Sequence, residues 1–166
     1  LLLGSETGQY REVGDLAGIA LDRRGRGGVI EDFNADGKLD LLVINREDVP
    51  SLFVNQGPLD APSPAQGLGN FLRVELSNGA VNPQGIGASI SVKTGNRFQT
   101  KTVAIGGGHA SGQMGFSHFG LGQADIAQVR VKWPQTGWSA PFQVFANTHV
   151  ILDRETNSLR TWHAID

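Results

Sequence analysis

The chain has 166 residues, enough for one ordinary domain or for a small domain with part of a second. Its net charge of −2 offers no basic field to nucleic acid or an anionic membrane, no apolar run approaches the about 20 residues of a membrane-spanning helix, and the lack of cysteine excludes disulfides and thiolate chemistry. Twenty-three glycines and seven prolines, together with runs rich in Val, Ile, Thr and Phe, favour an all-β protein.

The first 28 residues predict a short strand, an irregular apolar segment and an arginine-rich loop. The strand is expected at residues 10–13, the apolar segment at 16–19 and the loop at 22–28. The arginines would suit an acidic partner, but charged clusters are more often solvated surface, and we interpret the loop as solvent-exposed.

Residues 32–40 carry oxygen-bearing side chains at alternate positions and predict a cation-binding turn. Calcium (Ca2+) binds carboxylate, amide and carbonyl oxygens at about 2.3–2.6 Å and tolerates irregular geometry, whereas magnesium prefers a near-ideal octahedron. Three carboxylates within nine residues repel one another unless a cation neutralises them. The expected ligands are four side chains and one backbone carbonyl: Asp32, Asn34, Asp36, Asp40 and, through its carbonyl, Lys38. We expect the Lys38 ammonium to point to solvent and Gly37 to supply a positive φ.

The acidic loop is not an EF-hand, because Val43 occupies the position at which that loop needs a bidentate glutamate. Strands are expected on both sides of it, at residues 28–31 and 39–45, with a third at residues 50–57. Together they predict a small antiparallel meander, packed with the rest of the chain. A sheet of this size cannot bury both faces by itself, so a neighbouring domain or further sequence must cover it.

The second half of the chain predicts a β-sandwich. Residues 58–70, rich in Pro, Gly and Ala, lack periodicity and predict a linker. In residues 71–153, strand patterns recur at short intervals and amount to about seven strands. Alternation in the first of these strands predicts that Leu72 and Val74 are buried and that Arg73 is on a wet face.

Two features of the sandwich segment suggest catalytic or phosphate chemistry only weakly. Residues 106–108 form a glycine run, but no Lys-Ser/Thr pair and no helical pattern follow it, so we interpret it as a turn. Ser111, His118 and Asp125 are the residue types of a hydrolase triad. No nucleophile-elbow motif surrounds the serine, and a hydrolase is therefore the least favoured alternative.

Tryptophans in the last third of the chain are candidates for sugar stacking. Trp138 lies in a glycine-bearing loop and is the better candidate for an exposed ligand contact. Trp133 is in phase with alternating valines, which predicts a place in the core. A glycan is thus a second candidate partner.

Several motifs carry a family resemblance. The segments GVIEDFNADGKLDLLVIN and PSLFVNQG resemble the FG-GAP or VCBS calcium-binding repeat, which builds propeller blades. The motifs FLRVELSN, NPQGIGASISVKTGNRFQTKTV, GGGHASG, HFGLG and VRVKWP follow in the order of the ASPIC and UnbV domain of the cartilage acidic protein-like family. The resemblance implies calcium at the five residues of the acidic loop and a secreted, non-catalytic module. The chain departs from the family pattern where Gly112 separates Ser111 from Gln113, and in having one visible calcium repeat.

The expected organisation is a calcium repeat at residues 1–57, a linker at 58–70, a sandwich at 71–153 and a C-terminal tail at 154–166. The leading hypothesis is a non-catalytic, calcium-stabilised module that is secreted, periplasmic or on the cell surface. It would mediate protein interaction or assembly, in part through an exposed β edge. Carbohydrate binding at Trp138 is the first alternative, and neither nucleic acid nor a membrane span is expected.

Overall fold

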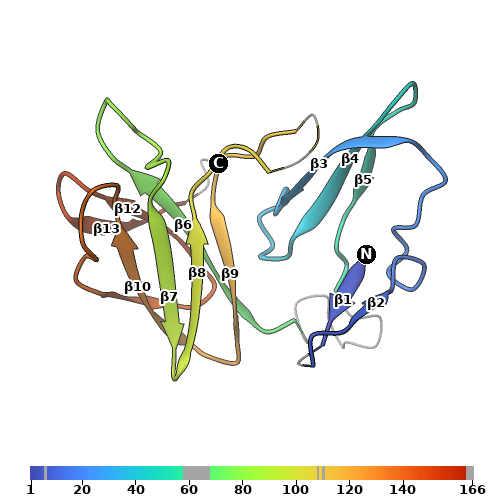
Figure 1. The fold of residues 1–166 in the computed structure, drawn as a ribbon. Helices are drawn as coiled ribbons and strands as arrows, with labels where there is room; N and C mark the ends of the chain where they lie inside the picture. Colours follow the sequence, from blue (N-terminus) through green and yellow to red (C-terminus); the bar gives the residue numbers. More distant parts are fainter. Residues whose placement is uncertain (6, 58–67, 108, 110, 164–166) are drawn as a thin grey trace.

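All regular elements of the structure are β-strands. The computed structural model describes residues 1–5, 7–57, 68–107, 109 and 111–163. Within them, thirteen strands form four sheets, which confirms the predicted all-β class. Two four-stranded sheets make a sandwich, and a three-stranded meander lies beside it (Figure 1). In these residues no helix is long and apolar enough to cross a membrane.

The sandwich consists of a junction sheet, whose Arg73 and His118 contact the acidic loop of the meander, and a far sheet on the other side of the core. The junction sheet has the order β13-β12-β6-β9 and contains β6 (Asn70–Ser77), β9 (Ser117–Gly122), β12 (Thr148–Asp153) and β13 (Ser158–Thr161). The far sheet has the order β11-β10-β7-β8 and contains β7 (Ser89–Thr94), β8 (Arg97–Thr102), β10 (Ile126–Lys132) and β11 (Phe142–Phe145). β6 and β12 run parallel, and the other neighbours in both sheets are antiparallel.

Alternating side chains of both sheets form one hydrophobic core between them. Leu72 and Val74 of β6 are fully buried, as predicted, and face Ile90 of β7 and Val129 of β10 in the same cluster. Trp133 also belongs to this core, as its phase with the valines predicted. Full burial of each large apolar side chain contributes about 1.5–3 kcal/mol, so this cluster holds the two sheets together.

The N-terminal part contains a hairpin and the predicted meander. The hairpin pairs β1 (Leu2–Gly4) with β2 (Tyr10–Glu12). The meander has the order β3-β4-β5, with β3 (Gly25–Glu31), β4 (Asp40–Asn45) and β5 (Ser51–Phe53) all antiparallel. β3 begins within the segment predicted as an arginine-rich loop, because its glycines continue to pair with β4 across a bulge. The acidic loop is the turn between β3 and β4.

The sandwich extends further along the chain than predicted. β13 lies in the segment assigned to the C-terminal tail, pairs with β12 and gives the sandwich eight strands instead of about seven. Leu159 of β13 packs against the core. The strand is short and has polar neighbours, so its alternation is too brief to be recognised from sequence. Residues 58–67 of the predicted linker lie outside the described residues.

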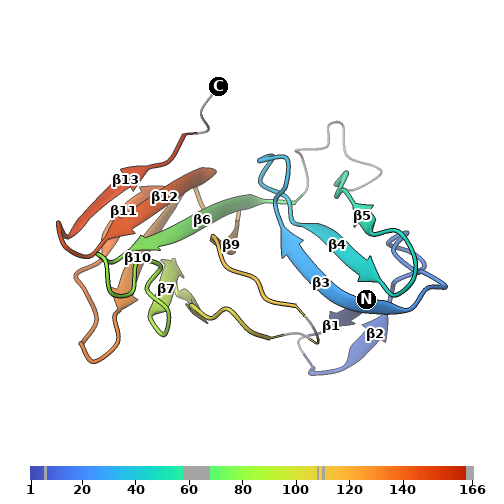
Figure 2. The ribbon, with the colours of Figure 1, turned by 90° about the horizontal axis from the view of Figure 1, so that it is seen from above.

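The meander and the sandwich are in contact. Seen from above, the segment between β8 and β9 extends from the sandwich toward β3 (Figure 2). The side-chain amide of Gln113 in this segment accepts a hydrogen bond from the Ile30 N–H at 3.2 Å and donates one to the Ile30 carbonyl. One position on the open edge of β3 is therefore capped by a side chain from the sandwich.

Candidate functional site

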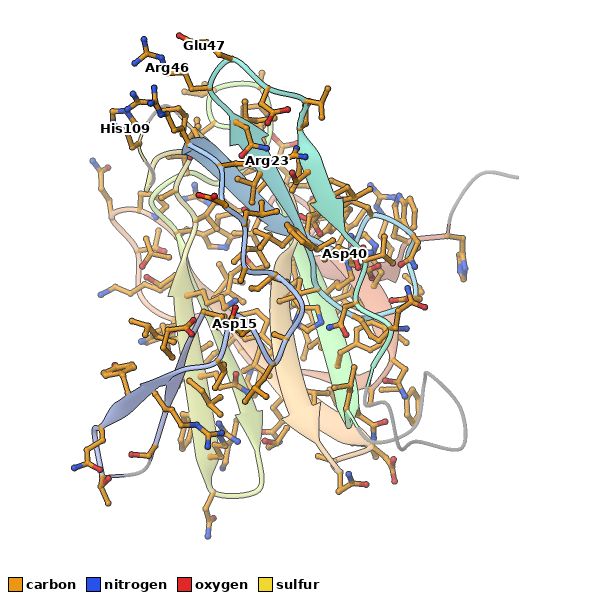
Figure 3. All side chains as sticks on the ribbon, turned by 90° about the vertical axis from the view of Figure 1, so that its right-hand side faces the viewer. Asp15, Arg23, Asp40, Arg46, Glu47 and His109 are labelled. Carbon is orange, nitrogen blue, oxygen red and sulfur yellow. The ribbon has the colours of Figure 1, made fainter. Side chains whose placement is uncertain are left out.

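The acidic loop is organised by the carboxylates at its two ends. Asp32 accepts hydrogen bonds from the backbone N–H groups of Asp36 at 3.0 Å and Gly37 at 2.9 Å. Asp40 accepts from the N–H of Phe33 at 3.1 Å and from that of Asn55, beyond β5, at 2.8 Å. Both carboxylates are buried, and Figure 3 labels Asp40, the first residue of β4. These side chains therefore fix the winding of the loop, a role typical of Asp in turns.

The middle of the loop is neutralised by its own lysine. The Asp36 carboxylate accepts hydrogen bonds from the Asn34 amide at 2.9 Å and from the Lys38 ammonium. The Lys38 side chain is only 9% exposed, so the prediction that its ammonium points to solvent is wrong. Burial by itself would raise the pKa of Asp36, but the hydrogen bonds from Lys38 and Asn34 outweigh it and leave that pKa below its usual value.

A buried arginine of the sandwich pairs with the start of the loop. Arg73 of β6 places one guanidinium nitrogen 3.1 Å from the Asp32 carboxylate and another 3.1 Å from that of Glu31. The guanidinium carbon lies 4.6 Å from the centre of the Phe116 ring. Because the meander covers this face of β6, the predicted wet position of Arg73 is wrong. The carboxylate crowding expected from the sequence is thus relieved in part by Arg73 and Lys38.

The donor set of the loop fits calcium by its chemistry, since all five expected ligands offer oxygen. A carboxylate has about four lone-pair sites, and Asp32 and Asp40 retain acceptor capacity beyond their backbone hydrogen bonds. In the described residues, however, no three His, Cys, Asp or Glu side chains converge as a metal centre. Asp36 and Lys38 line a cavity of about 660 Å³ between the loop and the end of β6. The Lys38 ammonium would compete with an ion for the Asp36 carboxylate.

The three residue types of a hydrolase do not come together. His118 of β9 places Nε2 3.0 Å from the Gly37 carbonyl, so its ring contacts the acidic loop. Burial lowers the pKa of His118, which keeps the ring neutral. Asp125 accepts a hydrogen bond from the Asn70 amide at 3.1 Å instead. In the part of the chain that the structure describes, no hydrogen bond links His118 to Ser111 or Asp125.

Trp138 lies apart from the acidic loop, at the far sheet. Its side chain is 40% exposed, and the guanidinium carbon of Arg130 lies 4.6 Å from its ring centre. A backbone bridge to Lys132 places it beside β10. The candidate ligand contact and the candidate calcium ligands therefore belong to two separate surfaces.

Two contributors to the junction were not predicted from the sequence. Arg73 has the alternation of a surface residue, and alternation does not reveal that a second module covers that surface. Gln113 lies in a glycine-rich segment without periodicity, so nothing in its surroundings indicates the pairing with Ile30. Both are long-range contacts, and a local pattern carries no signal for them.

The fold and this geometry define a class of protein: an eight-stranded β-sandwich joined through a buried arginine to a meander with an acidic turn. Comparison with known families identifies the sandwich more closely. Residues 78–158 match the family described as ASPIC and UnbV, so this segment belongs to that family. The match begins within the sandwich, and the resemblance of residues 28–57 to FG-GAP or VCBS repeats remains a prediction.

Three similar proteins carry the name cartilage acidic protein 1. The protein from Xenopus tropicalis is 31% identical over 115 residues, which are 68% of this chain and 17% of that protein. Those from Mus musculus and Homo sapiens are each 32% identical over 113 residues, or 67% of this chain and 16% of theirs. The chain therefore spans less than a fifth of the length of these relatives.

Proposed function

We propose that the chain is a non-catalytic, extracellular or cell-surface module that mediates protein–protein contact or assembly. The observation that carries this proposal is the exposure of the apolar meander. The relatives are named for cartilage, which supports a secreted or surface location, and the separation of His118 from Ser111 supports the absence of hydrolysis. A stabilising calcium ion at the acidic loop is part of the proposal.

Both faces of the meander present apolar side chains to the surface. Ile30 on one face is 54% exposed, and Leu52 and Ile44 on the other are 54% and 45% exposed. The hydrophobic core cluster contains sandwich residues and none from β3, β4 or β5. Large exposed apolar patches are typical of protein interaction sites, and a partner that covered these side chains would bury them.

The edges of the meander favour β5 as the place for an added strand. An open edge offers unpaired backbone groups to an incoming strand. On β3, the Gln113 amide already occupies the Ile30 backbone groups. β5 is the other outer strand of this sheet. We therefore infer that a partner strand would add beside Leu52 rather than beside Ile30.

Self-association tests this surface directly. Sedimentation velocity over a wide range of protein concentrations should reveal association of the wild-type chain. Leu52→Glu should abolish it, because a charge would enter the apolar contact, whereas Val81→Glu, at a fully exposed position of the sandwich, should not. A wild-type chain that stays monomeric throughout, with its meander amides as slow to exchange as those of the sandwich, would contradict an assembly surface.

Calcium binding is tested by stability. A ligand specific for the folded state, present at about 100 times its Kd, stabilises by about 2.7 kcal/mol, so calcium should raise the melting temperature relative to EDTA. Asp36→Asn should reduce this rise and Lys38→Met should enlarge it, because the ammonium competes for the same carboxylate. Asp15→Asn is the matched control in the meander half of the chain. An unchanged melting curve in EDTA and no heat on calcium titration would refute the site.

A further inference from the structure

The outward surface of the far sheet carries a group of cations and aromatic rings, here named the basic face: Lys93, Phe98, Arg130, Lys132 and Trp138. Strand register places the first of these residues together. Lys93 of β7 pairs with Phe98 of β8 on one side and with Gln128 of β10 on the other, while Arg130 pairs with Ser91. Lys93 and Arg130 are thus diagonal neighbours, about 7–8 Å apart by ordinary sheet geometry. Their alternate neighbours, such as Val129, point into the core.

The cations of the basic face have no acidic partner in the described residues. The ion pairs of the molecule involve the N-terminus, Arg23, Lys38, Arg46 and Arg73, and none of them lies on the far sheet. In the sequence, Asp125 is the only acidic residue between positions 78 and 152. The far sheet is therefore locally positive, although the net charge of the whole chain is −2.

Aromatic rings hold two of these cations in place without neutralising them. The Lys93 ammonium lies 5.4 Å from the Phe98 ring centre, and the Arg130 guanidinium carbon lies 4.6 Å from that of Trp138. Both distances are within the about 6 Å range of cation–π attraction. Phe98 is 57% exposed and Trp138 is 40% exposed. Part of each ring thus stays available for stacking against a ligand.

A hollow of about 230 Å³ lies between Arg130 and the Lys93–Phe98 pair. Ser91, Gln128 and Ser139 line it together with Lys93 and Arg130. This volume is below the about 300–1,000 Å³ of pockets that enclose drug-sized ligands. The hollow fits one ring of a longer chain, with hydroxyl and amide groups for hydrogen bonding and a cation on each side.

We propose that the basic face binds an anionic polysaccharide that bears sulfate or carboxylate groups. Arg130 and Lys93 would bind the anionic groups, because charge-assisted hydrogen bonds to such oxygens are strong. Phe98 and Trp138 would stack on the apolar faces of the sugar rings. An acidic peptide would satisfy the cations but would leave the flanking rings and the ring-sized hollow without a role. The site lies on the far sheet, away from the meander surface proposed for protein contact.

The test uses the whole chain and heparin as the probe, measured by isothermal titration. The double variant Lys93→Gln/Arg130→Gln should weaken heparin binding about tenfold or more, which corresponds to about 1.4 kcal/mol, because it removes the charge of both side chains that would bind the anionic groups. Trp138→Ala should weaken it as well. Two matched controls should bind like the wild type: Arg46→Gln, an exposed cation of the meander, and Tyr10→Ala, a 73% exposed ring of the hairpin.

Two further polysaccharides test whether binding requires anionic groups: dextran sulfate should bind and neutral dextran should not. The variant Leu52→Glu should leave heparin binding unchanged, because it alters only the meander surface. Poly-glutamate that binds as tightly as heparin, with Trp138→Ala without effect on either, would overturn the proposal in favour of an acidic-peptide or simple charge site. No binding of heparin at low ionic strength would overturn it too.

Discussion

Gly37 lies where the acidic loop touches the sandwich. Its φ is +86°, in the left-handed region that favours glycine, and its N–H donates to Asp32 while its carbonyl contacts His118. A Cβ at this position would overlap the ring of Phe71. The residue is therefore constrained both by its backbone conformation and by the close approach of β6.

Gly37→Ala should destabilise the fold by about 2–5 kcal/mol, the sum of left-handed strain and overpacking. Gly95→Ala separates the two terms. Gly95 also has a positive φ, of +54°, but a Cβ there would meet no atom within 4 Å. Urea denaturation of both variants is the measurement. Equal losses would mean that the Phe71 contact contributes nothing.

At the scale of elements, the junction between β6 and the acidic loop depends on one buried arginine. Arg73→Met retains the packing of the side-chain stem but leaves Asp32 and Glu31 without their shared cation. Removing one partner of a buried ion pair costs about 3–5 kcal/mol. We expect a loss of that size in urea denaturation, with amide exchange in the meander accelerated more than in the sandwich.

The exposed Arg97→Met, on β8, is the matched control and should change stability by less than about 0.5 kcal/mol. A double-mutant cycle with Glu31→Gln measures the coupling across the junction. If Arg73→Met cost no more than the control, the meander would be held by other contacts, such as that of Gln113 with Ile30.

The sequence predicts most strands of both modules because alternation is a local signal, but it misses the short strands β1 and β13. The order of the strands is not local: the parallel pairing of β6 with β12 joins segments more than 70 residues apart in the chain, and no pattern in either strand indicates it. The acidic loop was recognised from its spacing, and the structure places its carboxylates as turn organisers. The positions of the Arg73 and Lys38 side chains were wrongly predicted, because alternation does not show that a second module covers Arg73 and the loop spacing does not show that Lys38 pairs with Asp36. Calcium remains a proposal.

At the scale of the whole molecule, the covered face of the junction sheet makes stability depend on pH. His149 of β12 lies beside Arg73 in register, is 8% exposed, and contacts the rings of Phe116 and Trp162. In the described residues neither of its ring nitrogens has a hydrogen-bond partner. Burial, and then the charge of Arg73, lowers the pKa of His149 from 6.5 to about 4.

The pKa of His149 is lower in the folded protein than in the unfolded chain. As the pH falls, the unfolded chain therefore binds a proton at His149 before the folded protein does. The contribution of neutral His149 is therefore complete above about pH 6.5 and is lost between that pH and about 4, by up to about 3 kcal/mol. Burial of His118 adds a loss in the same direction. His149→Leu should flatten the fall in unfolding free energy between pH 7 and 4, whereas His163→Leu, at an exposed position, should leave it unchanged. Parallel pH profiles for His149→Leu and the wild type would show that His149 binds its proton as readily in the folded protein as in the unfolded chain.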